Sequence, residues 1–188
     1  MKKELRSKLR AILGGIPPEE LQRKSRVATS LMIREPEYKN AEIIMIYLSL
    51  PNEADTTSLV LQAWQDRKKV VAPQVTWESR QMIPVEIRDL NEDVTETGVG
   101  IRQPVRGLPI PIELIDLVIV PGLGFDPFGN RLGRGRGFYD RFLAKPQFRG
   151  VATGFALEAQ VVESIPAGAH DIKVSMLATD ERIRRFDP

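Results

Sequence analysis

The chain contains no cysteine and only one histidine, His170, among its 188 residues. Without cysteine it has no disulfide bonds, no thiolate nucleophile and no cysteine metal ligands, and one histidine excludes a multi-histidine metal centre. No apolar run approaches the length that crosses a bilayer, and the charged N-terminus lacks the apolar core of a signal sequence. We therefore expect a cytoplasmic protein without a membrane partner.

Charges of the two signs nearly cancel. Lysine and arginine number 27 against 25 aspartates and glutamates, which leaves a net charge of +2 and a pI of about 9.0. A few extra arginines do not make a polybasic surface, so we expect no nucleic-acid partner. The hydrophobic content of 42% is enough for a sizeable core. The length suits one domain, residues 1–188, which we expect to be a monomer.

Segments with helical spacing alternate with short apolar runs typical of buried strands. The expected helices cover residues 2–13, 17–35, 58–68, 138–144 and 156–164. The expected strands cover residues 42–48, 69–72, 82–87, 116–120, 151–155 and 174–178. This alternation indicates an α/β fold, a three-layer α/β/α single domain with a mainly parallel central sheet. In such sheets ligands bind beyond the carboxyl ends of the strands.

The most informative stretch, residues 118–143, reads VIVPGLGFDPFGNRLGRGRGFYDRFL. A buried strand leads into a turn and then into a loop in which glycines at 133, 135 and 137 alternate with arginines. Glycine lets backbone N–H groups approach a ligand, and the helix start that follows favours anions. Arginine suits phosphate oxygens, and Asp140 is an oxygen ligand of the kind that Mg²⁺ uses beside phosphates. We interpret the stretch as a site for a phosphorylated, Mg²⁺-associated ligand, although no Gly-Lys-Ser/Thr closes it as in a Walker A loop.

The residues alone leave three alternatives for this loop. It could be a solvated surface loop in which Asp140 only complements the helix dipole. It could belong to a binding module without catalysis. It could also bind nucleic acid, in which case affinity would fall steeply with salt.

Several single residues have a structural interpretation beside a functional one. Trp64 lies in the middle of an expected helix and is expected in the core, and Asp126 before a proline is expected to form a turn. Glu53 is expected to be a solvated neighbour of Asp55. His170 is expected to be structural rather than part of a site. Trp77 has no predicted place.

The glycine-arginine stretch closely resembles the signature of the 5-formyltetrahydrofolate cyclo-ligase (methenyltetrahydrofolate synthetase) family. Weaker matches follow in the family's order over nearly the whole chain. They are Lys2 with Arg6, Tyr47-Leu-Ser-Leu-Pro-Asn-Glu-Ala-Asp-Thr56, Gly100-Ile-Arg-Gln-Pro104, Gly154-Phe-Ala-Leu-Glu-Ala-Gln160, Ile165-Pro166 and His170-Asp171.

The resemblance implies an enzyme that uses ATP and Mg²⁺ to close 5-formyltetrahydrofolate, a reduced folate, into 5,10-methenyltetrahydrofolate. The formyl oxygen would attack the γ-phosphate to give a phosphorylated imidate, which N10 of the folate then attacks as phosphate leaves. Catalysis of this kind depends mainly on positioning and charge neutralisation.

The resemblance also implies roles for particular residues. Arg134 and Arg136 would be catalytic, and Asp140 and Asp171 would hold Mg²⁺. Leu50, Asp55 and Phe138 would contact the folate. The nucleotide site would be formed by Lys2, Arg6, Arg131, Gly133, Arg134, Gly135, Arg136, Gly137, Phe138 and Tyr139, although which arginine faces ATP and which faces folate stays open.

Two residues depart from the family's common pattern. Phe138 stands where many members have tyrosine, so a hydroxyl contact is lost. Arg136 stands where lysine or glycine is common, and a guanidinium differs from an ammonium in geometry.

Overall fold

The computed structural model describes residues 1–97 and 100–187. Its helices are α1 (Lys2–Gly14), α2 (Pro18–Met32), α3 (Pro36–Asn40), α4 (Thr57–Gln65) and α5 (Phe138–Leu143), with 3₁₀ turns η1 (Ile112–Leu114) and η2 (Glu158–Gln160). Its strands are β1 (Ile43–Ile46), β2 (Lys69–Thr76), β3 (Gln81–Glu86), β4 (Val94–Thr97), β5 (Ile101–Pro104), β6 (Leu117–Val120), β7 (Gly124–Phe125), β8 (Arg131–Leu132), β9 (Val151–Phe155), β10 (Met176–Ala178) and β11 (Ile183–Arg185).

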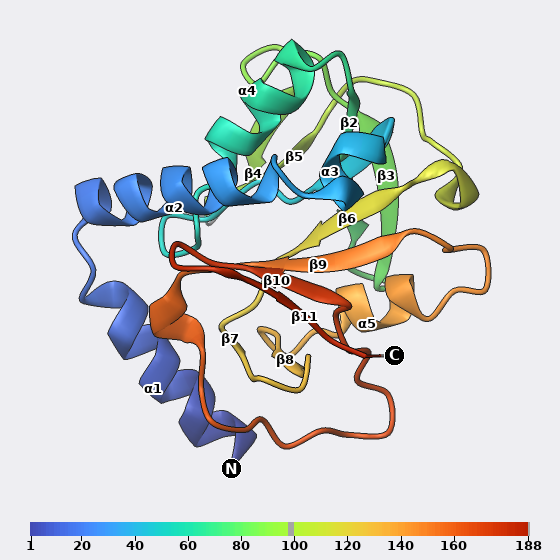
Figure 1. The fold of residues 1–188 in the computed structure, drawn as a ribbon. Helices are drawn as coiled ribbons and strands as arrows, with labels where there is room; N and C mark the ends of the chain where they lie inside the picture. Colours follow the sequence, from blue (N-terminus) through green and yellow to red (C-terminus); the bar gives the residue numbers. More distant parts are fainter. Residues whose placement is uncertain (98–99, 188) are drawn as a thin grey trace.

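Seven strands form the central sheet in the order β11-β10-β9-β6-β1-β2-β3. The five inner strands are parallel to one another, and the edge strands β3 and β11 are antiparallel to their neighbours. Helices α2, α3 and α4 lie on one side of the sheet and α5 lies on the other (Figure 1). The predicted three-layer α/β/α arrangement with a mainly parallel sheet is confirmed. One domain over residues 1–188, a range that includes the undescribed residues 98, 99 and 188, stays a prediction.

The inner strands are apolar throughout because both of their faces are covered. In β1, Ile44 and Ile46 pack into the cluster that contains α2 and α4. Met45 between them points to the opposite face and packs into the cluster that contains Phe142 of α5. Helices therefore cover both faces of these strands, and the carboxyl ends of the strands remain open.

Helix α1 packs beside the edge of the sheet. Leu9 and Leu13, which are 0% and 2% exposed, pack in one cluster with Leu132 of β8 and with Leu123 and Ile165, which lie in the loops that follow β6 and η2. Figure 1 shows α1 next to the small β7–β8 hairpin. This packing places the N-terminal part of α1 beside the glycine-arginine loop.

The prediction that the strand starting at Lys69 ends at Pro73 is wrong, because β2 continues to Thr76. Pro73 lies opposite Pro84 in the antiparallel pair β2–β3. The carbonyl of Pro84 accepts a hydrogen bond from Ile110 on the outer side, so the backbone polar groups of this position point away from β2. A proline does not interrupt the pairing of two strands at a position where no backbone N–H is needed as a donor between them.

The helix predicted over residues 156–164 is also wrong, since only the turn Glu158–Gln160 is helical. The Gln160 side chain accepts from the Leu157 N–H and donates to the Gly122 carbonyl. Val162 then donates to the Phe125 carbonyl, which holds the following chain extended against β7. Tertiary hydrogen bonds thus replace the local helix. The sequence pattern also did not predict α3 or β11.

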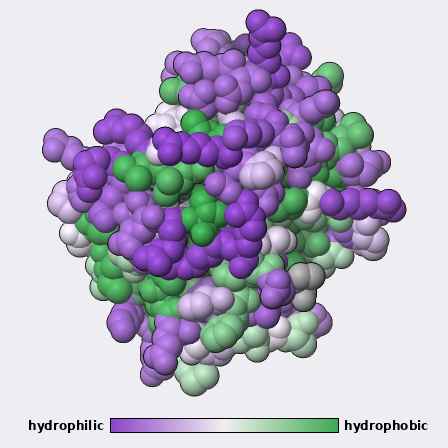
Figure 2. Space-filling model, viewed as in Figure 1, coloured by the Kyte–Doolittle hydropathy of each residue, from purple (hydrophilic) through white to green (hydrophobic). Residues whose placement is uncertain are grey.

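The surface drawn in Figure 2 is mostly hydrophilic, with hydrophobic residues scattered between polar ones. Scattered apolar residues are normal on a protein surface and indicate no partner by themselves. Within the described residues, no helix combines the length and the apolar character that crossing a membrane requires.

Candidate functional site

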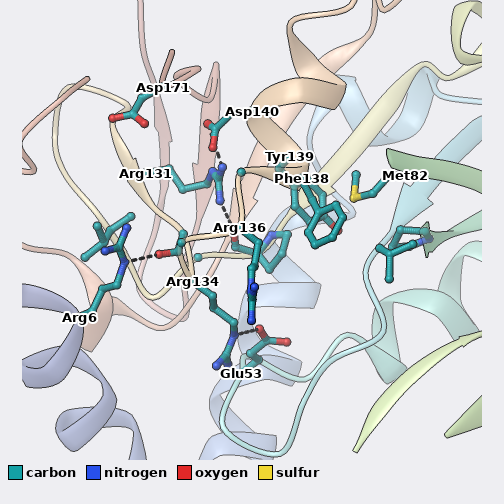
Figure 3. Close-up of a pocket in the computed structure, with 18 of the residues that line it drawn as sticks. Arg6, Glu53, Met82, Arg131, Arg134, Arg136, Phe138, Tyr139, Asp140 and Asp171 are labelled. Atoms are coloured by element: carbon teal, nitrogen blue, oxygen red, sulfur yellow. Dashed lines mark hydrogen bonds and ion pairs between the residues drawn. The ribbon is translucent and has the colours of Figure 1, made fainter. Parts of the chain in front are cut away.

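A cavity of about 320 Å³ lies beyond the carboxyl ends of β2 and β6, where this fold class binds ligands (Figure 3). Charged side chains line one part of it and apolar side chains line another. The predicted site residues that line it are Lys2, Arg6, Arg131, Gly133, Arg134, Gly135, Arg136, Gly137, Phe138, Tyr139, Asp140 and Asp171. The predicted residues that do not line it are Leu50 and Asp55.

Lys2 and Arg6 reach the cavity from the first turns of α1. Their spacing of four residues places both on one face of the helix, while Leu9 and Leu13 turn the helix toward the loops it packs against. Arg6 Nε donates to the Gly133 carbonyl at 2.9 Å, and the Lys2 ammonium forms an ion pair with Asp171. Arg6 is thereby held at the glycine-arginine loop and Lys2 at Asp171, although both cations lie far from these partners in the sequence.

Arg131 is the most buried cation of the site, with an exposed fraction of 8%. Its Nη2 donates to Asp140 Oδ1 at 3.0 Å and its Nη1 donates to the Pro121 carbonyl at 3.2 Å. Its Nε is buried and has no partner among the described residues. A buried guanidinium with a donor to spare is suited to an anion in the cavity.

Asp140 and Asp171 are held at the same corner of the cavity. Asp140 Oδ1 accepts from the Ile172 N–H at 3.1 Å, which ties α5 to the residue next to Asp171. Asp171 Oδ2 accepts from Lys2 and from the Gly168 N–H. Burial disfavours the charged form of Asp171, but these bonds outweigh it and lower the pKa of the carboxyl. In the described part of the chain, Asp140 Oδ2 and Asp171 Oδ1 accept no hydrogen bond, so each carboxylate has one oxygen left for a cation.

Three or more acidic, histidine or cysteine side chains do not gather into a metal cage anywhere in the described residues. Mg²⁺ is commonly bound through one or two carboxylates together with substrate phosphates and water. The Asp140–Asp171 pair fits that kind of site. The metal role of both residues stays a prediction.

The glycine-arginine loop needs glycine at two of its positions. Gly135 has φ +102° and Gly137, which precedes α5, has φ +68°, conformations that residues with a Cβ rarely adopt. These turns aim the neighbouring arginines differently. Arg134 pairs with Glu53, whereas the Arg136 guanidinium lies 5.7 Å from the ring centre of Trp77.

Glu53 is buried in the cavity wall, contrary to the expectation of a solvated residue. It is 8% exposed, and its Oε1 accepts from Arg134 Nε at 2.9 Å. Its Oε2 accepts from the Leu50 N–H at 2.9 Å. Glu53 therefore orients Arg134 and leaves the end nitrogens of that guanidinium available to a ligand. No local signal distinguished Glu53 from its acidic neighbour.

The apolar part of the cavity is formed by Pro73, Val75 and Trp77, together with Met82, which pairs with Val75 on the neighbouring strand β3, and Phe138. The rings of Trp77 and Phe138 meet edge to face with centroids 5.4 Å apart. The residues at 73, 75 and 77 alternate along β2 and its extension, so one face of the strand lines the site. Because the predicted strand ended at Pro73, the alternation of residues 73, 75 and 77 was not recognised, and no position was predicted for Trp77.

The Tyr139 hydroxyl is buried beside the cavity and has no hydrogen-bond partner among the described residues. Burial, with a further contribution from the negative charge of Glu53, raises the pKa of Tyr139. The phenol therefore stays protonated at neutral pH and is a donor. An unpaired donor at a cavity is available to a bound ligand.

Leu50 and Asp55 line a neighbouring hollow, which shares Glu53 with the cavity. Asp55 Oδ1 accepts a hydrogen bond from the N–H of Thr57, the first residue of α4, at 2.9 Å. The folate-binding role of both residues stays a prediction.

Other residues behave as expected of structural groups. Asp126 is fully buried and accepts hydrogen bonds from Phe128, Asn130 and Ile165, which fixes the β7–β8 turn. Trp64 packs against the core. His170 is exposed and does not line the cavity.

Comparison with known proteins gives the family of this chain. The model of the 5-formyltetrahydrofolate cyclo-ligase family matches residues 1–180. The chain belongs to the 5-formyltetrahydrofolate cyclo-ligase family. The resemblance stated from the sequence is confirmed, and so is the prediction of an enzyme of the ligase class.

Curated relatives that bear the family name include a mammalian and a bacterial protein. The 5-formyltetrahydrofolate cyclo-ligase of Mus musculus is 32% identical over 183 residues, which cover 92% of this chain and 90% of the relative. That of Escherichia coli strain K12 is 30% identical over 173 residues, covering 89% of this chain and 94% of the relative. The NMR structure of Aquifex aeolicus 5,10-methenyltetrahydrofolate synthetase is 32% identical with a TM-score of 0.86, and the match covers 100% of this chain and 93% of that one.

Proposed function

We propose that this cyclo-ligase family member converts 5-formyltetrahydrofolate to 5,10-methenyltetrahydrofolate and uses ATP and Mg²⁺ to do so. The observation that carries the proposal is the two-part cavity. Lys2, Arg6 and Arg131 supply positive charge in one part, and an aromatic wall with Trp77 and Phe138 lines the other. A triphosphate and a flat heterocycle would meet between them.

The chemistry requires activation of a formyl oxygen, which is a poor leaving group. In the proposed reaction this oxygen attacks the γ-phosphate, and the bond from the γ-phosphorus to the bridging oxygen of ADP breaks. N10 then attacks the formyl carbon, loses its proton, and the C–O bond to phosphate breaks. The products are ADP, phosphate and the methenyl ring.

The side chains of the cavity would contribute positioning and charge. Lys2, Arg6 and Arg131 would bind phosphate oxygens, and Arg134, oriented by Glu53, would neutralise charge that develops on the transferred group. Mg²⁺, which neutralises phosphate charge, would be held by Asp140 and Asp171 through their remaining oxygens. The cytoplasmic location, the monomeric state and the lack of nucleic-acid or membrane partners stay predictions.

The proposal is tested by incubating the protein with 5-formyltetrahydrofolate, ATP and Mg²⁺ and following near-ultraviolet absorbance as the methenyl product forms. We expect a rise that depends on all three. A folded protein that binds ATP but gives no rise, beside an active control enzyme, would instead support the binding-module alternative.

Asp140→Asn should strongly reduce the Mg²⁺-dependent rate. It should also lower stability by about 1–3 kcal/mol, because it removes the charged partner of the buried Arg131. Raising Mg²⁺ should restore part of the rate if the metal role is right. A rate that equals that of the unchanged protein would disprove the metal assignment.

A further inference from the structure

The two carboxylates at the charged corner of the cavity each pair with a cation of the protein. Asp140 Oδ1 accepts from Arg131 Nη2 at 3.0 Å, as the dashed line in Figure 3 shows. Asp171 Oδ2 accepts from the Lys2 ammonium. Two positive charges thus face two negative ones, and Arg6 is a further cation in the same part of the cavity. A divalent cation that entered this corner alone would be repelled by positive charge that the carboxylates do not fully offset.

The two ion pairs differ in how easily they can open. The Arg131 side chain is 4% exposed and also donates to the Pro121 carbonyl at 3.2 Å, so it is fixed from two sides. The Lys2 side chain is 31% exposed, and within the described residues Asp171 is the one hydrogen-bond partner of its ammonium. Lysine carries a point charge on a flexible stem, so Lys2 can change its partner while Arg131 stays in place.

Asp171 does not depend on Lys2 for its position. Its Oδ2 also accepts from the Gly168 N–H at 2.6 Å, and its own N–H donates to the Gly168 carbonyl at 3.1 Å. This turn holds the carboxylate at the cavity whether or not the ammonium stays beside it. If Lys2 moves away, the full charge of Asp171 becomes available to a cation without a rearrangement of the loop.

A phosphate group bound at Arg6 would lie within reach of Lys2. Arg6 is one helical turn further along the same face of α1, and its Nε is held by the Gly133 carbonyl at 2.9 Å. The two end nitrogens of Arg6 have no hydrogen-bond partner in the part of the chain that the structure describes. They can therefore bind a phosphate beside the Lys2 ammonium. A triphosphate carries several negative charges, so it competes for Lys2 with the single charge of Asp171.

We propose that Lys2 exchanges Asp171 for a phosphate group when the nucleotide binds, and that this exchange makes metal binding depend on the nucleotide. The inference rests on the proposed function, which supplies the triphosphate and the metal role of Asp140 and Asp171. Before the exchange, the ammonium offsets the charge of Asp171 and weakens its attraction for a metal ion. After the exchange, the ammonium neutralises phosphate charge instead. Lys2 is thus a positioning residue that couples the two binding events.

The test measures the binding of each ligand alone, and no folate is present. Electron paramagnetic resonance gives the Kd of Mn²⁺, which suits the same oxygen ligands as Mg²⁺, without nucleotide. Isothermal calorimetry gives the Kd of ATP in EDTA, without metal. Both are measured for the unchanged protein, Lys2→Met and Lys2→Arg. The matched control is Lys3→Met, which removes the same charge from the neighbouring exposed lysine outside the cavity.

We expect Lys2→Met to shift the two affinities in opposite directions. Mn²⁺ should bind about 5-fold more tightly because Asp171 has lost its internal cation, and ATP should bind about 5-fold more weakly because a phosphate has lost one. Adding Asp171→Asn to Lys2→Met should abolish the gain in Mn²⁺ affinity. Lys2→Arg keeps the charge and should stay close to the unchanged protein, as should Lys3→Met. A merely structural role of Lys2 would weaken both ligands.

Unchanged affinity for either ligand in Lys2→Met, or weaker Mn²⁺ binding, would overturn the inference. An equal gain in Mn²⁺ affinity in Lys3→Met would also overturn it, because net charge alone would then explain the effect. The absorbance assay judges the proposed function separately. Ring closure with unchanged Mn²⁺ affinity in Lys2→Met would reject the exchange and keep the reaction, whereas opposite shifts without ring closure would keep the exchange and reject the reaction.

Discussion

Two buried polar atoms that lack partners in the described residues, Arg131 Nε and the Tyr139 hydroxyl, belong to residues that line the cavity. Burying a polar group without a hydrogen bond costs about 1–3 kcal/mol. A fold tolerates such groups where a ligand satisfies them. At the scale of single residues, a substitution that removes one of these unpaired groups should therefore change stability and activity in opposite directions.

Tyr139→Phe should leave the protein as stable as before or more stable by up to about 1 kcal/mol, because it removes an unpaired buried hydroxyl. The same change should lower kcat/KM by about 10-fold if the hydroxyl donates to the bound ligand. Urea denaturation and the absorbance assay provide the two measurements.

The matched control is Tyr38→Phe on the far side of the sheet. The Tyr38 hydroxyl donates to Asp66 at 2.6 Å, so its loss should reduce stability by about 1 kcal/mol and leave turnover unchanged. If Tyr139→Phe behaved like Tyr38→Phe, its hydroxyl would have only a structural role.

The glycine-arginine loop and α5 act together as one element. Helix α5 has only six residues, too few to be stable alone, and it is held by Phe142 and Leu143 in the core. Its first turn follows the left-handed Gly137, and this turn presents Asp140 and Tyr139 to the cavity. The backbone conformation at Gly137 thus controls several site residues at once.

Gly137→Ala should destabilise the protein by about 1–2 kcal/mol, because a side chain in the left-handed region is strained and its Cβ would crowd Arg141. It should also weaken folate binding more than this loss of stability explains. Gly14→Ala is the control: its Cβ would meet nothing within 4 Å, and alanine favours the helix by about 0.5–1 kcal/mol. Equal denaturation midpoints for the two variants would refute the strain argument.

At the scale of the whole molecule, ion pairs fasten the C-terminal edge strand β11 to distant parts of the chain. Arg184 forms two hydrogen bonds with Glu158 of η2, and Arg185 pairs with Glu35 and Glu37 at α3. Because these links lie away from the cavity, they should govern stability rather than catalysis.

The Arg184 hydrogen bonds lower the pKa of Glu158 below its ordinary value of 4.5, against the opposing effect of burial. A lowered pKa in the folded state means that the unfolded chain binds more protons on acidification. The stabilisation is therefore present above about pH 4.5 and is lost as the pH falls through the lower folded pKa. Glu158→Gln should cost about 1–2 kcal/mol at neutral pH and should reduce the loss of Tm on acidification.

Calorimetric melts between about pH 7 and about pH 3.5 would check this, since the curves of the variant and the unchanged protein should converge in acid. Glu20→Gln, which removes an exposed partner of Arg23, should change Tm little at any pH. Parallel curves for Glu158→Gln would mean that the pair is not linked to protonation.

The sequence by itself determined the alternation of strands and helices, the strand-loop-helix around residues 118–143 and a phosphate-type chemistry for its arginines and Asp140. These features are local, because spacing, glycine conformation and charge act between near neighbours. Only the tertiary structure decided how distant residues pair. Glu53 and Arg134 are 81 residues apart and Lys2 and Asp171 are 169 apart, so packing of α1 and the sheet, rather than any local pattern, brings them together.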